Sequence, residues 1–470
     1  MPTDLPNIVL VVFDTARHDR FGCYGYGKPT TPTVDSLARG GLRVETMVSN
    51  APWTQPAHAS LFTGLYPTQH GAQWRTGPKL RPAVEVTMAE WLRGLGYDTW
   101  CVTNNGMISS RTGLARGFDH YAFRLDLEAG WRRRWRRLER VAHGGDSGGR
   151  IVNRWMRDEL PRAKRPTFLF VNYLECHWAY APPPRFVERV GGPAYAPLEA
   201  MRYRARVAAR VGPWEAVARA SSHDLDVLST YYDAELANVD EHLEELLGVL
   251  GSTGIVGDDG RSLVMVTSDH GEHLGERGLA DHHASLDEVL CRVPFVAWGP
   301  GVVPGGAVRE RLAEFVDVLP SVACLLDREP PAAYLEKRRT DLFTEAGSDG
   351  HEYAFAEWRA WADGERARLA RRNPSYRGFD ELARDLVSAR DRRFKLVRGS
   401  DGREELFDLD TDPGEGTDVA SAHPEALSAL RGQLDARTAE WTSWESGPTA
   451  GITAEERAEI ESRLEDLGYI

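Results

Sequence analysis

Three apolar runs in the sequence each pass directly into polar residues, and this pattern constrains the fold more than any other feature. The runs cover residues 8–13, 167–173 and 263–266. They are rich in Val, Leu, Ile and Phe and have no alternating polar face, which is typical of strands buried on both faces of a parallel sheet. We therefore predict strands of a parallel sheet at these three places.

Helical patterns lie between the predicted strands. The clearest falls within residues 225–247, where apolar residues recur at helical spacing: Leu228, Tyr231, Tyr232, Leu236, Val239, Leu243 and Leu246. Alternating strands and helices predict an α/β fold, with a doubly wound, mostly parallel sheet flanked by helices. Ligands of such sheets bind beyond the carboxyl ends of the strands. We therefore expect Asp14, residues 175–177 and residues 269–270 to lie together.

The first part of the chain, residues 1–388 of 470, is predicted to form the catalytic α/β domain, with a helical insert at about residues 124–165. This insert contains a run of Trp and Arg at residues 131–137. One interpretation of the run is a solvated helix with aromatic anchors, since charge runs usually mark exposed faces. The other is a cationic cover over an anionic substrate.

The sequence pattern changes near residue 390 to short strand candidates, which predicts a small carboxy-terminal α+β subdomain over residues 389–450. Two short strand patterns, residues 394–397 and 405–409, are separated by a Gly-containing turn and predict a hairpin. The last segment, residues 451–470, is expected to be a terminal helix, because Thr453 and Glu456 have the spacing of a capping box.

The charge and the apolar stretches exclude several classes of partner. A formal net charge of −13 gives no long-range attraction for nucleic acid or an anionic membrane surface. The amino-terminal segment lacks the basic start of an export signal, and no apolar stretch approaches the ~20 residues of a membrane span. The five cysteines have no metal-site spacing, so we expect most of them to be buried small hydrophobes rather than members of disulfides. We therefore predict a soluble, cytoplasmic protein.

Carboxylates and an imidazole follow two of the predicted strands. Asp14 comes directly after the first, and Asp269 and His270 come after the third. Taken alone, Asp14 is better explained as a helix N-cap. Together, however, these oxygen and nitrogen donors suit Mn²⁺, Zn²⁺, Mg²⁺ or Ca²⁺, so the three residues are candidate metal ligands.

Thr54 stands at the start of an apolar helical pattern, within the segment of residues 50–64. It could serve as the N-cap of that helix. A hydroxyl at this place also lies where backbone N–H groups favour an anion, so Thr54 is a candidate reactive residue as well.

Taken together, these segments resemble the sulfatase family of the alkaline phosphatase superfamily. The resemblance covers almost the whole chain and is thinnest at residues 124–165 and 191–221. It is carried by the following motifs: the strand-end Asp14, Pro-x-x-Ala-Ser-Leu-x-Thr-Gly at residues 56–64, Ser-Asp-His-Gly-Glu at 268–272, Arg-Val-Pro-Phe at 292–295, Phe-Asp-Leu-Asp-Thr-Asp-Pro at 407–413 and the ending Leu-Gly-Tyr-Ile.

The chain also departs from the sulfatase pattern. Thr54 stands where sulfatases carry the Cys or Ser that becomes formylglycine, and His58 replaces their Arg. Thr15 takes the place of the second early acidic ligand, and residues 104–106 replace the Lys and His of the Gly-Lys-Trp-His motif. Formylglycine chemistry is therefore expected to be absent.

The resemblance implies a metal-dependent ester hydrolase with one divalent cation per chain. The expected ligands are Asp14, Thr15, Thr54, Asp269 and His270. The expected catalytic residues are Thr54 as nucleophile with His58, His177 and His282, the choice between His282 and His283 being open. Two-metal relatives carry a further Asp-x-x-x-His site, which we do not find in this chain.

A Thr nucleophile is what phosphodiesterases and phosphoethanolamine transferases of the superfamily use. The expected substrate is therefore a small anionic ester of phosphate type, with a phosphodiester or phosphonate monoester favoured. The alternatives are a sulfuric ester hydrolase, a phosphoryl-type transferase and a catalytically silent binding protein. The sequence leaves the oligomeric state undetermined.

Overall fold

The computed structural model describes residues 5–73, 79–82, 84, 86–127, 145–192, 213–257, 261–329, 341–343, 350–361, 363–376, 378–379 and 382–445. Two predicted features lie outside these residues. They are the Trp and Arg run at residues 131–137 and the terminal helix at residues 451–470.

A mostly parallel sheet of nine strands forms the centre of the described structure, in the order β11-β2-β10-β6-β1-β5-β3-β4 with β9 paired to β2. Its parallel central part consists of β6 (Ser262–Ser268), β1 (Asn7–Phe13), β5 (Thr167–Tyr173), β3 (Asp98–Thr103) and β4 (His120–Phe123). The other strands are β2 (Leu42–Val48), β9 (Arg292–Val293), β10 (Phe295–Trp298) and β11 (Ala307–Glu314). The three strands predicted from the sequence are therefore confirmed as neighbours, with β1 between β5 and β6.

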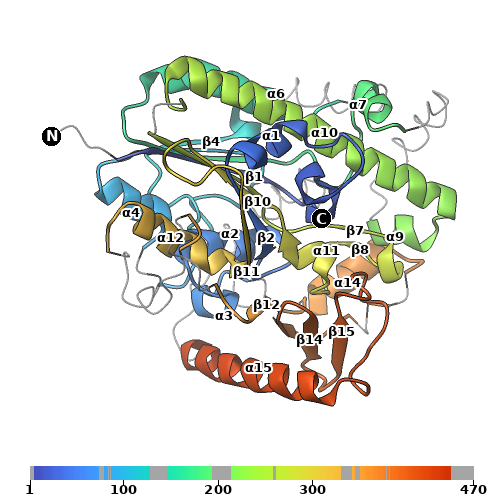
Figure 1. Cartoon of the computed structure of the whole chain (residues 1–470). Coiled ribbons are helices and arrows are strands. Elements are labelled where there is room, and N and C mark those ends of the chain that lie inside the picture. Colours follow the sequence, from blue (N-terminus) through green and yellow to red (C-terminus); the bar gives the residue numbers. More distant parts are fainter. Residues whose placement is uncertain are drawn as a thin grey trace.

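Both faces of the sheet are buried, because helices cover each of them (Figure 1). Val9, Val11 and Phe13 of β1 belong to the core beneath one helical layer, whereas the alternate residues of β1 belong to the core of the other. The first layer contains α1 (Pro32–Gly40), α6 (Gly149–Glu159), α7 (Pro184–Arg189) and α10 (Ser222–Thr253). The second contains α2 (Thr54–Thr63), α4 (Met88–Gly94) and α12 (Val318–Leu325). This arrangement confirms the doubly wound α/β fold.

The long helix α10 extends beyond the predicted residues 225–247 at both ends. It begins with a capping box, in which the Ser221 side chain accepts from the Asp224 backbone and the Asp224 carboxylate accepts from the Ser221 backbone. It ends at Gly254, whose φ of 68° is a left-handed conformation that glycine adopts without strain. The caps thus set the ends of a helix whose apolar pattern identified only its middle.

Shorter elements connect these layers. The helices are α3 (Pro67–His70), α9 (Pro213–Ala218), α11 (Glu288–Cys291) and α14 (Asp363–Arg372). The 3₁₀ turns are η1 (His18–Arg20), η2 (Gly22–Tyr24), η3 (Arg124–Leu127), η4 (Leu160–Arg162), η5 (Glu276–Gly278) and η6 (Phe315–Asp317). A two-stranded ribbon pairs β7 (His273–Leu274) with β8 (Ala280–Asp281).

A second, antiparallel sheet of four strands lies against the large one. Its strands are β12 (Ala354–Trp358), β13 (Leu386–Arg390), β14 (Phe394–Gly399) and β15 (Glu404–Asp408), and α15 (Pro424–Glu445) packs on it. The predicted hairpin is confirmed as β14 and β15. The sheet starts at Ala354, and the domain boundary at residue 389 stays a prediction.

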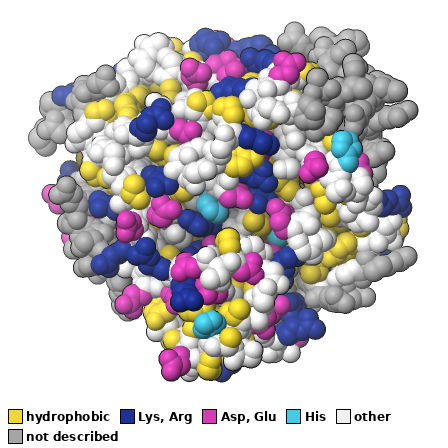
Figure 2. Space-filling model, turned by 45° about the vertical axis from the view of Figure 1, so that its right-hand side comes forward, with side chains coloured by type: hydrophobic (Ala, Val, Ile, Leu, Met, Phe, Trp, Pro, Cys, Tyr) yellow, Lys and Arg dark blue, Asp and Glu magenta, His cyan; other side chains and the backbone are white. Residues whose placement is uncertain are grey.

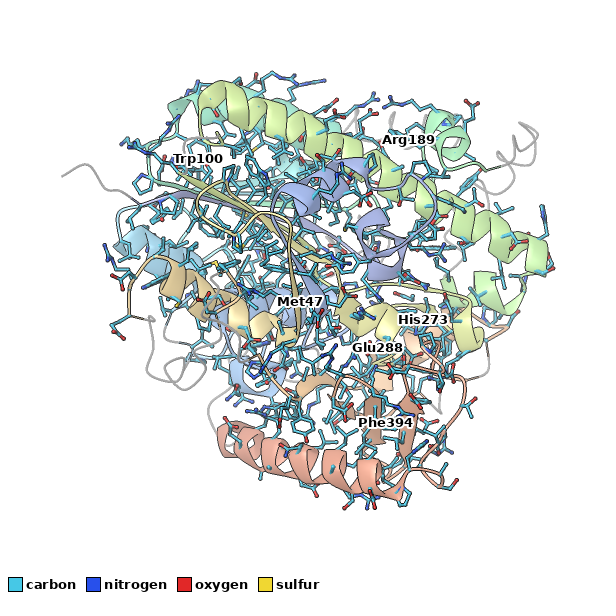
Figure 3. The ribbon with its side chains drawn as sticks, in the orientation of Figure 1. Met47, Trp100, Arg189, His273, Glu288 and Phe394 are labelled. Carbon is cyan, nitrogen blue, oxygen red and sulfur yellow. The ribbon has the colours of Figure 1, made fainter. Side chains whose placement is uncertain are left out.

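Buried ion pairs join this small sheet to the main domain. Figure 3 labels Glu288 where the two parts meet. Its carboxylate accepts from Arg390 of β13 and pairs with Lys395 of β14 at 3.2 Å. Lys395 also pairs with Glu415 at 2.9 Å. Because these charges are buried, each needs its oppositely charged partner to offset the cost of its burial. The network therefore fixes the position of the small sheet relative to the main domain.

Acidic and basic side chains are interspersed over the described part of the face in Figure 2. Within the described chain, no helix combines the length and the apolar character that a membrane span requires.

Candidate functional site

The carboxyl ends of three adjacent strands bring the predicted ligands together. Phe13, the last residue of β1, pairs with Tyr173 of β5 and with Ser268 of β6. Asp14 and Asp269 therefore emerge side by side, one residue beyond the sheet. One ligand atom each of Asp14, Asp269 and His270 lies within 4.8 Å of the others, and all three residues are fully buried.

The unpaired carboxylate oxygens of this cluster fit a divalent cation. Asp14 Oδ1 and Asp269 Oδ2 are buried with no hydrogen-bond partner in the described structure. Burial raises the pKa of Asp14 to about 6, opposed by its hydrogen bond from Asn105. Burial also raises the pKa of Asp269, and the neighbouring Asp14 raises it further. A bound cation would compensate both buried carboxylates, so the donor set fits the expected metal.

The ring of His270 is oriented as a metal-binding histidine should be. Its Nδ1 lies 2.9 Å from the Gly271 carbonyl, which fixes the proton on that nitrogen. Its Nε2 therefore carries the lone pair, and it lies 3.4 Å from Asp269 Oδ2. The same Nε2 is 3.4 Å from the hydroxyl oxygen of Thr54.

Thr54 is the first residue of α2 and is buried at the meeting point of the strand ends. The N-cap position of this helix belongs to Trp53, which corrects the interpretation of Thr54 as the N-cap. Its hydroxyl oxygen lies 3.4 Å from His270 Nε2 and 3.3 Å from Asn105 Nδ2. Thr54 thus presents its hydroxyl to the cluster from the start of α2, whereas Asp14, Asp269 and His270 follow strands.

Thr15 contributes its backbone to the site. Its N–H donates to Asp269 Oδ1 at 3.1 Å, and its φ of 61° is left-handed, a strained conformation for a β-branched residue. Its hydroxyl donates to the Cys176 carbonyl at 2.5 Å. Thr15 therefore orients Asp269 and ties β1 to β5, while its role as a metal ligand stays a prediction.

Asn105 is a site residue that sequence reasoning missed. Its side-chain amide donates to Asp14 Oδ2 at 2.8 Å and faces the Thr54 hydroxyl. It lies just beyond the carboxyl end of β3, as Asp14 does beyond β1. Its position after a strand is the sequence feature that could have identified it. In the sequence, residues 104–106 stand out only because they differ from the family motif.

His58 adjoins the cluster and lies one helical turn after Thr54 in α2. Its Nδ1 donates to the Thr54 carbonyl at 2.8 Å and lies 3.6 Å from Asp269 Oδ2. The ring packs edge-on against Phe62 and Phe170. Burial lowers the pKa of His58 to about 4, so the ring is neutral at pH 7 and supplies no fixed positive charge.

Two further histidine rings adjoin His270. The His282 ring centroid is 4.3 Å from that of His270 and 5.3 Å from that of His177. His283 packs instead against Trp358 and Trp361. The structure therefore brings His282 and His177 to the cluster, and it places the His283 ring in the aromatic core beside them.

Acidic residues bracket one nitrogen of His282. Its Nδ1 lies 2.9 Å from Asp281 Oδ1 and 3.2 Å from Glu272 Oε1. Burial opposes protonation of this ring, but the two carboxylates outweigh it and raise the pKa of His282 above its usual range. Burial lowers the pKa of His177 to about 3, and the neighbouring His282 lowers it further. The two rings therefore differ in charge: His282 is a candidate acid and His177 a neutral partner.

Comparisons with known proteins identify the family of this chain. A model of the Sulfatase family matches residues 6–327. The uncharacterized sulfatase YidJ of Escherichia coli is 25% identical over 69% of this chain and 69% of its own length. Mouse steryl-sulfatase is 25% identical over 74% of this chain and 67% of its own.

Solved structures share the fold over nearly the whole chain. The phosphonate monoester hydrolase of Agrobacterium radiobacter has a TM-score of 0.69 at 21% identity, covering 96% of this chain and 98% of its own. A protein solved with its substrate D-glucosamine-2-N,6-O-disulfate also has a TM-score of 0.69, at 16% identity, covering 93% and 98%. At these identities the likeness concerns the fold.

Proposed function

Because the chain belongs to the sulfatase family of hydrolases, we propose that it hydrolyses phosphate-type esters through a covalent intermediate on Thr54. A phosphodiester or a phosphonate monoester is the favoured substrate. The observation that carries this proposal is the position of the Thr54 hydroxyl, which lies 3.4 Å from His270 Nε2 and is linked to Asp14 through the Asn105 amide.

Activation of Thr54 requires help, because a free threonine hydroxyl is a poor nucleophile at neutral pH. Asp14, Asp269 and His270, with Thr54 and Thr15 as further oxygen ligands, would hold a divalent cation such as Mn²⁺, Zn²⁺, Mg²⁺ or Ca²⁺. When bound, it would favour the alkoxide of Thr54 and neutralise charge on the attacked group.

The remaining steps are those of this chain's own residues. The Thr54 oxygen attacks phosphorus, and the bond from phosphorus to the leaving alcohol oxygen breaks. His282, which Asp281 and Glu272 keep protonated, donates a proton to that oxygen, and His177 binds the reacting group beside it. Water then attacks phosphorus and gives one proton to His282. The bond from phosphorus to the Thr54 oxygen breaks, the acid leaves, and the Thr54 oxygen regains from solvent the proton it lost before the attack. Asn105 holds Asp14 and the Thr54 hydroxyl in place throughout.

Threonine disfavours sulfate esters as substrates. A sulfated formylglycine hydrate breaks down when its second hydroxyl collapses to the aldehyde, and threonine has no such route. Its ester must be opened by attack at phosphorus or sulfur, which phosphoryl enzymes do readily. The fold also accommodates phosphorus esters, since phosphonate monoester hydrolases have it.

The neutral ring at position 58 disfavours a doubly charged substrate. Sulfatases carry an arginine there, whereas His58 is uncharged at pH 7. A phosphate monoester carries up to about two negative charges, but a diester or phosphonate monoester carries one. We therefore rank diesters and phosphonate monoesters first, phosphate monoesters second and sulfate esters last.

Matched 4-nitrophenyl esters test this ranking. The measurement is kcat/KM of the metal-loaded protein for a phosphodiester, a phosphonate monoester, a phosphate monoester and a sulfate, with Thr54→Ala as the blank. We expect one of the two singly charged phosphorus esters to be the best substrate. A sulfate ester turned over faster than every phosphorus ester would reject the proposal, and phosphoryl transfer to an added alcohol would identify a transferase.

A further inference from the structure

A second group of metal-ligand side chains lies beside the catalytic cluster and has no role in the proposed reaction. It consists of Asp146, Glu175 and His242. Glu175 follows the carboxyl end of β5, Asp146 precedes α6, and His242 lies in α10. Three segments far apart in the sequence therefore converge on one place beneath the helical layer.

The spacing of these groups suits a shared cation. His242 Nε2 lies 4.0 Å from Asp146 Oδ1 and 3.9 Å from Glu175 Oε1. One ligand atom from each residue lies within 4.8 Å of the others. Ligands bound at about 2.0–2.2 Å from one ion stand about 3–4 Å apart. A small contraction around a cation would therefore give ordinary coordination distances.

Polar atoms at this place are buried without hydrogen-bond partners. Glu175 is fully buried and His242 is 2% exposed. In the part of the chain that the structure describes, Glu175 Oε2 and both ring nitrogens of His242 have no hydrogen-bond partner. Leaving such atoms unsatisfied is costly, so these atoms are candidates to bind a buried water or ion.

The surroundings hold the ligand side chains in position. The Gly149 N–H donates to Glu175 Oε1 at 2.8 Å, and Tyr173 stacks on His242 with ring centroids 6.1 Å apart. A Cβ on Gly149 would lie 2.3 Å from His242 Cδ2. Only glycine therefore allows the start of α6 to lie this close to the His242 ring. The close approach brings Asp146, which precedes α6, towards Glu175 and His242.

Another cluster of similar composition shows the contrast. Glu314, Asp317 and His351 also lie within 4.8 Å of one another. Both Glu314 oxygens accept hydrogen bonds, from Asn50, Phe355 and Tyr66, and the His351 ring lies 2.8 Å from Asp317. That cluster is satisfied by the protein itself, whereas the one at Glu175 is not.

We propose that Asp146, Glu175 and His242 bind a second divalent cation, of the Zn²⁺ or Mn²⁺ type that takes mixed carboxylate and imidazole ligands. Glu175 stands two residues before His177, and the Cys176 carbonyl between them accepts the Thr15 hydroxyl. The cation fixes α6 and α10 to the strand end that carries these residues. The site does not depend on the substrate or nucleophile proposed above.

Metal content tests the site with Zn²⁺ alone as the probe. The full chain is stripped with a chelator, loaded with Zn²⁺, dialysed, and its zinc per chain is measured by plasma mass spectrometry. The variants are Asp269→Asn for the catalytic cluster, His242→Asn for the second site, and both together. The matched control is His120→Asn, an exposed histidine with 44% of its side chain accessible.

We expect about two zinc ions per chain in the parent and in His120→Asn, about one in each single variant, and none in the double variant. Glu175→Gln keeps an acceptor for Gly149 and serves as a second variant, with circular dichroism verifying the fold. If zinc content is unchanged by both His242→Asn and Glu175→Gln, the proposal is overturned. A loss on His242→Asn without a loss on Asp269→Asn would reject the catalytic site alone.

Discussion

The amide nitrogen of Asn105 lies 3.3 Å from the hydroxyl oxygen of Thr54. The same amide donates to Asp14 Oδ2 at 2.8 Å. One side chain therefore links the candidate nucleophile to a candidate metal ligand, although the three residues come from different elements. The orientation of Asn105 is itself fixed, because its backbone N–H donates to Thr103 and Asn172.

We predict that Asn105→Ala lowers kcat by about 10- to 100-fold, the usual effect of removing a residue that orients a metal ligand. The control is Asn7→Ala, because Asn7 lies at the opposite, amino-terminal end of β1, where its amide donates to the Ile255 carbonyl at 2.9 Å. Steady-state kinetics on the best phosphorus ester gives the answer. Equal kcat values for the two variants would remove Asn105 from the site.

We predict that Asp269→Ala and His270→Ala each lose the catalytic cation and all hydrolysis while the protein stays folded. The reason is that strand-end ligands can be removed without opening the core. Zinc content and far-ultraviolet circular dichroism provide the measurement. The exposed Asp410, 68% accessible, gives the matched control Asp410→Ala. A full complement of bound metal in a folded His270→Ala protein would contradict the ligand assignment.

We predict that Thr54→Ala lowers turnover by several orders of magnitude, whereas Thr54→Ser keeps part of it, because the hydroxyl carries the chemistry. Thr63→Ala is the control in the same helix, since the Thr63 hydroxyl donates to the Ala59 carbonyl and accepts from the Leu65 N–H, both at the far end of α2. Its loss costs about 1 kcal/mol of stability and leaves turnover unchanged. A covalent adduct on Thr54, trapped by acid quench and located by mass spectrometry, is the direct test; activity retained in Thr54→Ala would exclude a nucleophilic role.

We predict that buried neutral histidines make the protein less stable as the pH falls. Burial lowers the pKa of His70 to about 3 from an ordinary value of 6.5. Between these values the unfolded chain binds a proton that the folded protein does not. For this residue the free energy of unfolding therefore decreases by about 1.4 kcal/mol for each unit by which the pH is lowered. This contribution is complete above pH 6.5 and is lost progressively down to the folded pKa.

Comparison with His70→Gln isolates this contribution from other groups. The measurement is the free energy of unfolding in urea at several pH values between about 4 and 6. The change of this free energy with pH should be smaller for His70→Gln, by the amount that corresponds to about one proton taken up on unfolding. His70 Nε2 lies 3.2 Å from both Ser60 Oγ and the Pro56 carbonyl, so the substitution also lowers stability at every pH. Parallel curves for the two proteins would mean that His70 is already protonated in the folded state.

The strand ends and the candidate metal ligands that follow them could be predicted from the sequence, because they follow from local pattern. An apolar run without a polar face identifies β1, β5 and β6, and the next residue along the chain must emerge at the carboxyl edge of the sheet. Asp14, Asp269 and His270 therefore required no tertiary information. Thr54 was found through its motif, and the helix α2 confirms its place at the cluster.

Tertiary structure alone decided the contacts made between elements. Whether His282 or His283 reaches His270, and whether His58 faces the site or Phe170, depends on side-chain directions that spacing does not define. His242 is one position in the long helix α10, and no local pattern distinguishes it. It meets Glu175 only because α10 crosses β5 at that turn, and the crossing is set by packing over the whole helical layer rather than by neighbouring residues.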